Sequence, residues 1–331
     1  MFGGKLVPVQ CYCLKLRENM SEEMKEIILA NPRGFCAGVV RAIATVRMAI
    51  ESHGAPIYVL HEIVHNRHVV DELKVLGAVF VEHLSLVPPG AICIFSAHGV
   101  SRQMQQMATA LELRTINATC PLVSSVHRMV EKYHRQGIEV IIIGHHRHPE
   151  VEGTAGRVGD RVHIVSDEAE AEALVLLDPE QVAYVTQTTL SQDEVAGIRA
   201  VLLRRFPGIR EPGTSICYAT QNRQNAARAL ARECDLVLVV GSKNSSNSNR
   251  LREVATRNNT RAYLIDDEGD IDPVWLVGAG RVGITAGASA PERLVTGVVS
   301  WLGSHGYEGA REMAGREERV RFSPAALIDS E

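Results

Sequence analysis

The sequence predicts an α/β protein built from three similar domains with mostly parallel sheets. Short strands of buried type alternate with helical patterns along the chain. A lone cysteine followed directly by a helical pattern occurs at three places, and polar loops follow each cysteine at similar distances. We therefore expect a threefold internal repeat of about 90 residues, which is the size of a small domain.

Each repeat opens on its cysteine. Cys36 lies between the strand-like "EIILA" and a segment whose apolar residues have helical spacing, "AGVVRAIATVRMAI". Cys120 precedes the helical pattern "PLVSSVHRMVEKY", and Cys217 precedes the alanine-rich "YATQNRQNAARALA". We expect each cysteine at the point where a strand ends and a helix begins.

Two further strands, each ending in a polar loop, follow every cysteine. The first loops, "HEIVHN", "GHHRHPEVEG" and "GSKNSSNSNR", follow their cysteines at almost the same distance in each repeat. The second loops, "FSAHGVS", "TQTTLS" and "TAGASAPE", lie farther along at distances that vary a little more. Loops at the carboxyl ends of parallel strands gather at one edge of the sheet, where ligands bind. If the three domains face one another, all of these loops converge.

The converging side chains would be thiols, imidazoles, one carboxyl, hydroxyls and an amide. They are Cys36, Cys120, Cys217, His65, His98, His148, Glu150, Thr188, Thr189, Ser245, Ser246, Asn247 and Ser289. Helix amino termini at the same edge add partial positive charge and free N–H groups, which suit phosphate. The centre of such a trefoil is expected to hold a metal and an anion together.

Composition narrows the function classes. The 331 residues carry a formal net charge of −4, so no basic field indicates nucleic acid or an anionic membrane, and no apolar run is long enough to cross one. The opening "MFGGKLVPVQCYCLKL" matches neither a secretory signal nor a lipoprotein site. Seven cysteines without disulfide-like spacing favour the reducing cytoplasm.

Other cysteines and histidines have simpler explanations. Cys93 and Cys234 lie in strand-like or apolar surroundings and are expected in cores. His61 is expected to be structural, because the spacing "HEIVH" lacks the rest of a zinc-protease pattern. His145 and His146 fit either a solvated cluster or the site. "KNSSNSN" fits either a polar linker or a binding loop, and its position after a buried-type strand favours binding.

Nine motifs in order carry a resemblance to a known family. They are "NPRGFCAGV", "HEIVHN", "FSAHGVS", "ATCPLV", "GHHRHPEVEGT", "TQTTLS", "ICYATQNRQ", "GSKNSSNSNRL" and "TAGASAPE". Together they resemble the LytB/IspH family of 4-hydroxy-3-methylbut-2-enyl diphosphate reductases, which act in the non-mevalonate isoprenoid pathway. The resemblance spans about residues 26–303.

The resemblance implies a trefoil of three α/β domains around an iron–sulfur cluster. It assigns Cys36, Cys120 and Cys217 as the ligands of one 4Fe–4S cluster with one open iron. Glu150 would be the proton source and Thr188 a relay to the departing oxygen. The substrate's diphosphate would be bound by His65, His98, His148, Thr189, Ser245, Ser246, Asn247 and Ser289.

The family's reaction removes the allylic hydroxyl of the substrate reductively and gives isopentenyl and dimethylallyl diphosphate. The resemblance also implies a ferredoxin or flavodoxin as electron donor. Two features depart from the family: Val40 stands where an acidic residue is usual, and His146-Arg147 replaces a small pair before His148. The segment before Met24 has no counterpart, and Met24 resembles the usual start.

The expected domain boundaries follow from the repeats. They are an N-terminal extension 1–25, domains 26–118, 119–215 and 216–303, and a C-terminal tail 304–331 that packs on the first domain. Two other functions fit part of the pattern. A zinc-dependent phosphoester hydrolase would use the histidines and Glu150. A non-catalytic iron–sulfur sensor would use the cysteines alone, which leaves the dense polar loops without a role.

Overall fold

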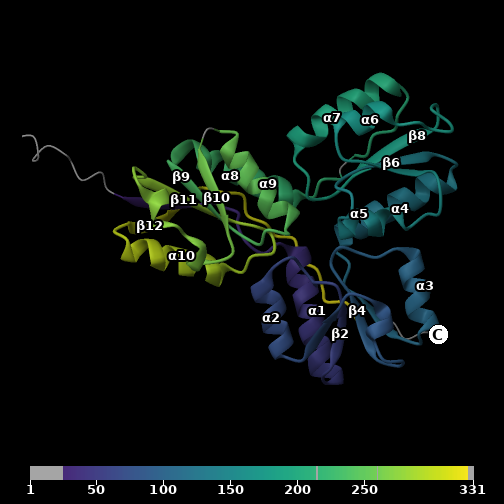
Figure 1. The fold of residues 1–331 in the computed structure, drawn as a ribbon, viewed down its shortest axis with the longest axis horizontal. Coiled ribbons are helices and arrows are strands. Elements are labelled where there is room, and N and C mark those ends of the chain that lie inside the picture. Colours follow the sequence, from purple (N-terminus) through teal and green to yellow (C-terminus); the bar gives the residue numbers. More distant parts are fainter. Residues whose placement is uncertain (1–24, 214, 259, 327–331) are drawn as a thin grey trace, which may run out of the picture.

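The computed structural model describes residues 25–213, 215–258 and 260–326. The predicted N-terminal extension, Lys25 excepted, lies outside the described residues. The named strands form three separate sheets, and each sheet with its helices makes one of the three lobes in Figure 1. Every pairing between these strands is parallel. The predicted α/β class is therefore confirmed.

Lobe 1 follows the first cysteine. Its strands, in sheet order, are β3 (Ala78–Val81), β2 (Ile57–Leu60), β4 (Ile92–Phe95) and β5 (Arg114–Asn117). Its helices are α1 (Ala37–His53), α2 (Arg67–Val75) and α3 (Arg102–Ala110), with a short 3₁₀ turn η2 (Leu84–Leu86). The buried face of α1 packs on β2 and β4 in an apolar core that includes Val46, Val59 and Ile94.

Lobe 2 follows the second cysteine. Its sheet order is β7 (Val162–Val165), β6 (Glu139–Ile143) and β8 (Val182–Thr186). Its helices are α4 (Pro121–Arg135), α5 (Pro149–Ala155), α6 (Glu168–Ala173) and α7 (Gln192–Arg205). Strands β6 and β8 are buried along their whole length, which fits strands of a parallel sheet that is covered on both faces. Arg210 adds a single parallel bridge to Ala183 beside β8.

Lobe 3 follows the third cysteine. Its sheet order is β10 (Arg261–Ile265), β9 (Leu236–Val240), β11 (Arg281–Ala286), β1 (Glu26–Leu29) and β12 (Glu308–Glu312). Its helices are α8 (Tyr218–Glu233), α9 (Ser246–Thr256) and α10 (Glu292–Ser304), with 3₁₀ turns η3 (Glu268–Asp270) and η4 (Pro273–Leu276). Two apolar cores lie on the two faces of this sheet.

Strand β1 differs from the predicted boundaries, which place residues 26–118 in the first domain. It pairs with β11 in the sheet of lobe 3, with Ile27 opposite Val282. The other two cysteines are approached in the same way. Strand β5 in the sheet of lobe 1 leads toward Cys120, and Arg210, which bridges to the sheet of lobe 2, leads toward Cys217. The segment before each cysteine thus belongs to the preceding lobe, and the first described strand completes the last lobe.

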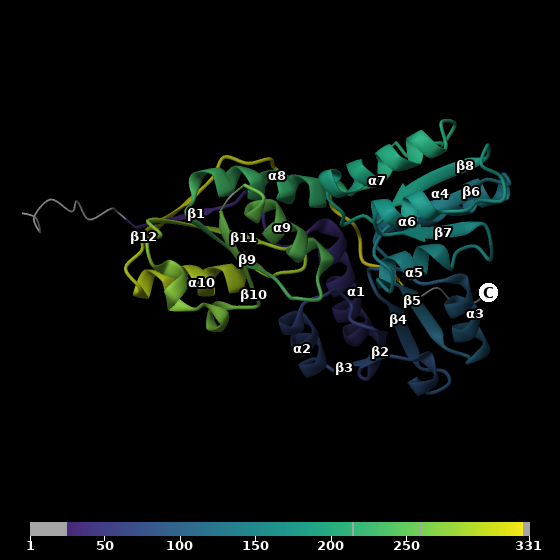
Figure 2. The ribbon, with the colours of Figure 1, turned by 45° about the horizontal axis from the view of Figure 1, so that its top comes forward.

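The C-terminal tail contacts two lobes. Strand β12 pairs with β1 and covers the edge that β1 would otherwise expose, so this part of the tail belongs to lobe 3. The chain then runs past α8 toward lobe 1, as the yellow trace in Figure 2 shows. There Ala325 packs on the lobe 1 core, and its backbone amide donates to Thr45 Oγ1 at 2.9 Å.

Candidate active site

The three repeat cysteines occupy equivalent positions, one at the start of α1, α4 and α8. Cys36, Cys120 and Cys217 are the N-cap residues of these helices. The backbone amide of each donates to a carbonyl in the second polar loop of the preceding lobe. These bonds are Cys36 to Ala288 (3.1 Å), Cys120 to Ala97 (3.0 Å) and Cys217 to Thr188 (3.1 Å). The next residue in each loop is a predicted site residue: Ser289, His98 or Thr189.

The thiols of these cysteines lie near one another. A Cβ added at Gly38 would be 2.6 Å from the Cys120 Sγ and 3.8 Å from the Cys36 Sγ. Burial raises the pKa of Cys120 to about 12 and that of Cys217 to about 11, and the thiol of Cys36 adds to both shifts. All three cysteines are free. The lobes therefore bring three free thiols together where three helices begin.

No trio of His, Cys, Asp or Glu side chains within residues 25–213, 215–258 and 260–326 is arranged around a single metal ion. The thiolates of an iron–sulfur cluster bind different iron atoms, so a shared ion is not the arrangement that a cluster needs. Arg41 on α1 adds a contact between the repeats, because its guanidinium donates to the carbonyls of Thr119 (3.0 Å) and Asn117 (3.4 Å). It thereby holds the segment that leads to Cys120.

Three histidines from lobes 1 and 2 form a compact cluster. The rings of His65 and His98 stack with centroids 4.2 Å apart, and the ring of His148 meets them edge-on at 5.8 and 6.0 Å. Burial, with the neighbouring imidazoles, lowers the pKa of His148 to about 4 and holds that of His98 well below its usual value. These two rings are therefore neutral at pH 7, and each carries one N–H donor.

Glu150 on α5 is buried, and both of its carboxyl oxygens are bonded to Thr188. The Thr188 amide donates to Oε1 at 2.6 Å, and the Thr188 hydroxyl donates to Oε2 at 2.9 Å. Burial raises the pKa of Glu150 to about 7, although the two bonds from Thr188 lower it in part. The carboxyl thus holds a proton over much of the neutral range, which suits a general acid.

Lobe 3 supplies hydroxyls and an amide from the start of α9 and the loop after β11. The Thr189 hydroxyl donates to Ser246 Oγ at 3.0 Å, and Ser289 Oγ donates to the His65 carbonyl at 2.9 Å. Ser245 caps α9 by accepting the amide of Ser248 at 3.3 Å. Asn247 is 4% exposed, and neither atom of its amide group has a partner among the described residues. A buried amide without partners is costly unless a ligand completes it.

The predicted site residues therefore follow the ends of strands, and contacts across the lobes join His65 and His98 to His148, Thr189 to Ser246, and Ser289 to His65. Ser245 and Asn247 lie beside Ser246 at the start of α9. His61, His145 and His146 have other partners. His61 pairs with Glu82, and His146 pairs with Glu170. The His145 Nε2 lies 2.9 Å from Arg250 Nη2. Cys93 and Cys234 are buried in apolar cores, as predicted.

Two residues that support the site were not predicted. The carboxylate of Glu62 lies 2.9 Å from His65 Nδ1 and accepts from Asn244 of lobe 3 at 2.8 Å. Its hydrogen bond with His65 lowers the pKa of Glu62, so this carboxylate stays charged. Gln187 donates to Thr189 Oγ1 at 2.8 Å and accepts the His145 amide at 3.0 Å. Both residues lie in motifs that carry the family resemblance, "HEIVHN" and "TQTTLS". Their position in these motifs is the sequence feature that could have indicated a role at the site.

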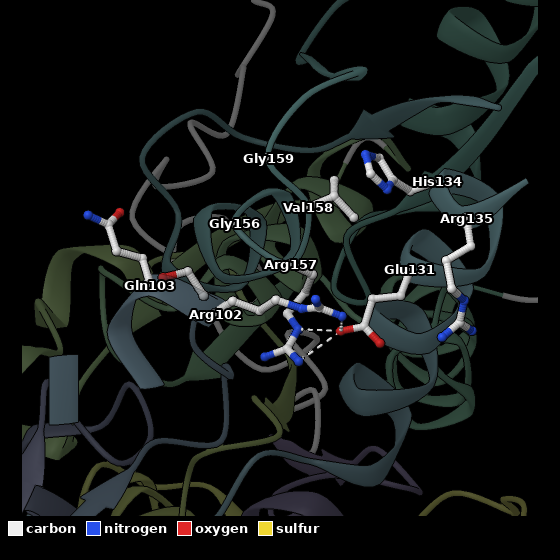
Figure 3. Close-up of a pocket in the computed structure, with 10 residues that line it drawn as sticks. Arg102, Gln103, Glu131, His134, Arg135, Gly156, Arg157, Val158 and Gly159 are labelled. Atoms are coloured by element: carbon white, nitrogen blue, oxygen red, sulfur yellow. Dashed lines mark hydrogen bonds and ion pairs between the residues drawn. The ribbon is translucent and has the colours of Figure 1, made fainter. Parts of the chain in front are cut away.

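A separate cleft of about 500 Å³ lies where α3 of lobe 1 meets α4 and α5 of lobe 2 (Figure 3). Arg157 bonds to Glu131 there at 2.8 Å, and Arg102 lies 3.5 Å from the same carboxylate. The cleft contains none of the predicted site residues. Glu131 and Arg157 both belong to lobe 2, whereas Arg102 belongs to lobe 1, so the contact of Arg102 with Glu131 joins the two lobes.

No helix in the described part of the chain is long and apolar enough to cross a membrane.

Comparisons with known proteins agree with this geometry. A family model described as "LytB protein" matches residues 27–303. The 4-hydroxy-3-methylbut-2-enyl diphosphate reductase of Desulfotalea psychrophila is 63% identical over 309 residues, which are 93% of this chain and 99% of that protein. The protein of the same name from Acinetobacter baylyi is 54% identical over 303 residues, which are 90% of this chain and 96% of that protein.

Solved structures give the same result. The E-1-hydroxy-2-methyl-but-2-enyl-4-diphosphate reductase from Plasmodium falciparum matches with a TM-score of 0.87 at 40% identity, over 90% of this chain and 94% of that chain. A second solved structure, (E)-4-hydroxy-3-methyl-but-2-enyl diphosphate reductase, matches with a TM-score of 0.62 at 31% identity, over 85% of this chain and 100% of that chain. Because the family model covers most of the sequence and these relatives match it along most of its length, this chain belongs to the LytB family.

Proposed function

We propose that this chain reduces 4-hydroxy-3-methylbut-2-enyl diphosphate to isopentenyl and dimethylallyl diphosphate, the last step of the non-mevalonate route to isoprenoids. Two electrons and two protons are consumed: the allylic C–O bond breaks, a C–H bond forms, and the oxygen leaves as water. The observation that carries the proposal is the meeting of three free thiols, two neutral imidazoles and the nearly neutral carboxyl of Glu150 at one junction. The names of relatives at 54–63% identity support it.

The residues present fit an iron–sulfur cluster. Cys36, Cys120 and Cys217 are free, come from three lobes and begin three helices, whose partial positive charge favours thiolates. Gly38 leaves the space between two of the sulfurs open, since a Cβ there would meet the Cys120 Sγ. We assign these cysteines as the ligands of one 4Fe–4S cluster, with one iron left without a protein ligand. Such a cluster, when bound, supplies single electrons and a Lewis-acidic iron.

Glu150 and Thr188 are assigned to proton transfer. The protonated carboxyl donates toward the leaving hydroxyl of the substrate, and the Thr188 hydroxyl, 2.9 Å from Oε2, relays that proton. Because Glu150 is 4% exposed, bulk water reaches its carboxyl poorly, which limits loss of the proton before the C–O bond breaks.

The diphosphate is assigned to hydrogen-bond donors at the junction. They are His65, His98, His148, Thr189, Ser245, Ser246, Asn247 and Ser289. The strongest support comes from Asn247, because its buried amide has no partner among the described residues and a phosphate oxygen would accept its N–H groups. Neutral imidazoles, hydroxyls and backbone amides at helix starts hold phosphate without an arginine.

A ferredoxin or flavodoxin is proposed as the electron donor, in the cytoplasm, where the free cysteines would stay reduced. The alternatives of a zinc-dependent phosphoester hydrolase and an iron–sulfur sensor gain no support, because the reported relatives are named as reductases.

The test is an anaerobic assay with the allylic diphosphate and reduced methyl viologen, which follows dye oxidation, together with iron and sulfide analysis. The wild type should contain iron and sulfide and oxidise the dye only when substrate is present. Cys120→Ser should lose both iron and activity. Cys93→Ala is the matched control, because Cys93 is buried in the lobe 1 core and should leave iron content unchanged. Full activity in a preparation free of metal would contradict the proposal.

A further inference from the structure

Arg223 on α8 is a buried charge, and each of its three guanidinium nitrogens has a hydrogen-bond partner. It is 1% exposed, and its guanidinium donates to the carbonyls of Gly34 (2.8 Å), Phe35 (3.1 Å) and Ala219 (3.0 Å). Gly34 and Phe35 directly precede Cys36. A buried guanidinium therefore fixes the backbone that delivers the first cysteine of the site.

The negative charge opposite Arg223 comes from the C-terminal tail. Both carboxylate oxygens of Glu318 accept from Arg223 Nη1 at 3.1 Å, and Oε1 also accepts from Asn222 at 2.9 Å. The Glu318 side chain is 14% exposed, so solvent screens this pair only in part. The family match ends at residue 303, which leaves Glu318 in a segment that the match does not cover.

The tail holds the same loop at other points. The Met313 amide donates to the Leu29 carbonyl at 2.9 Å. Gly315 lies so close to Asn31 that an added Cβ would be 2.3 Å from the Asn31 carbonyl oxygen. Farther along, Ala325 is bonded to Thr45 on α1 of lobe 1. Residues 313–325, the C-terminal strap, thus run from lobe 3 across the loop before Cys36 to lobe 1.

Arg223 also contacts the start of the helix that Cys217 caps. Its Nη1 donates to the carbonyl of Ala219, two residues after Cys217. Arg223, and through it the strap carboxylate, therefore contacts the segments that carry two of the three cysteines.

We propose that Glu318 and Arg223 are positioning residues for the iron–sulfur site: the strap carboxylate balances the buried guanidinium, which in turn holds the loop of Cys36. This inference rests on the proposed function, since it concerns the cluster assigned there. Removing the carboxylate charge leaves the buried positive charge of Arg223 unbalanced next to the loop that carries Cys36. Positive charge stabilises the reduced, more negative form of the cluster, so the midpoint potential should rise.

The experiment compares Glu318→Gln with Glu317→Gln in the full-length, anaerobically purified holoenzyme. Glu317 is the matched control, because the substitution changes net charge equally in the same segment. Its carboxylate is 72% exposed, and its ion-pair partner among residues 25–213, 215–258 and 260–326 is the exposed Arg319. Three readouts are measured: the midpoint potential, the electron paramagnetic resonance spectrum of the reduced cluster, and the rate of iron release to a chelator.

For Glu318→Gln we expect a more positive potential, an altered spectrum and iron release faster by about tenfold, the size expected from one lost charge-assisted hydrogen bond. Glu317→Gln should match the wild type in all three readouts. A Glu318→Gln protein that matches Glu317→Gln in potential and spectrum overturns the inference, even if its thermal unfolding temperature falls. A wild type without a cluster overturns the proposed function instead, so the two failures are distinguishable.

Discussion

Substituting Thr188 by valine tests the acid role of Glu150 through its pH dependence. The Thr188 hydroxyl donates to the charged carboxylate at 2.9 Å, and this bond lowers the pKa of Glu150. Valine has nearly the same shape and no donor. The pKa of Glu150 should therefore rise above its value of about 7.

The size of the shift follows from the contact. A hydrogen bond to a charged group contributes about 1.5 kcal/mol or more, and one pKa unit corresponds to about 1.4 kcal/mol. The Thr188 amide still donates to Oε1 at 2.6 Å, so only one of the two bonds is lost. We expect a rise of about one pKa unit. Because the reaction uses the protonated carboxyl, activity falls as pH rises through this pKa, and the fall should move from near pH 7 to near pH 8.

The assay is kcat/KM against pH with reduced methyl viologen under anaerobic conditions. The maximal kcat/KM of Thr188→Val should also be lower, since the proposed proton relay is gone. The pH at which kcat/KM declines does not depend on this maximal value. Thr189→Val is the control, because the Thr189 hydroxyl donates to Ser246 and not to Glu150. If the decline of kcat/KM at high pH stays at the same pH or moves to a lower pH in Thr188→Val, the assignment of this decline to the titration of Glu150 is refuted.

Three further substitutions test other parts of the site. Gly38→Ala puts a Cβ 2.6 Å from the Cys120 Sγ, so purified protein should contain less iron while its circular dichroism stays unchanged; normal iron content would count against a shared sulfur site. Asn247→Ala should raise KM by about tenfold with little change in kcat, as expected for one bond to a charged ligand, and an unchanged KM would remove it from diphosphate binding. Glu62→Gln should raise KM because His65 loses its fixed orientation, and a loss in kcat alone would argue against that role.

The repeats and the site loops could be predicted from the sequence because their signals are local. A cysteine between a strand pattern and a helix pattern fixes an N-cap position, and Cys36, Cys120 and Cys217 are N-caps. The carboxyl ends of parallel strands lie at one edge, so residues that follow the strands had to gather there. Glu150 and Thr188 come from two such loops of one sheet.

Other features depend on partners far away in the sequence. The pattern of Glu26–Leu29 predicts a strand, but its neighbours β11 and β12 lie toward the opposite end of the chain, and parallel pairing leaves no local mark of the partner. The role of Glu62 could not be predicted for the same reason, because its hydrogen bond with Asn244 joins lobes 1 and 3, which are far apart in the sequence. The role of Glu318 depends on a buried arginine in another element, which the charged run "GREER" does not indicate.

The placement of β1 has a consequence for how the chain assembles. A nascent protein usually folds from its N-terminal domain onward. Here the first of the named strands to leave the ribosome is an inner strand of the last sheet to be completed, so β1 must wait, unpaired, while lobes 1 and 2 form. Removing β1 or β12 would therefore damage this one sheet, while lobes 1 and 2 would keep all of their own strands.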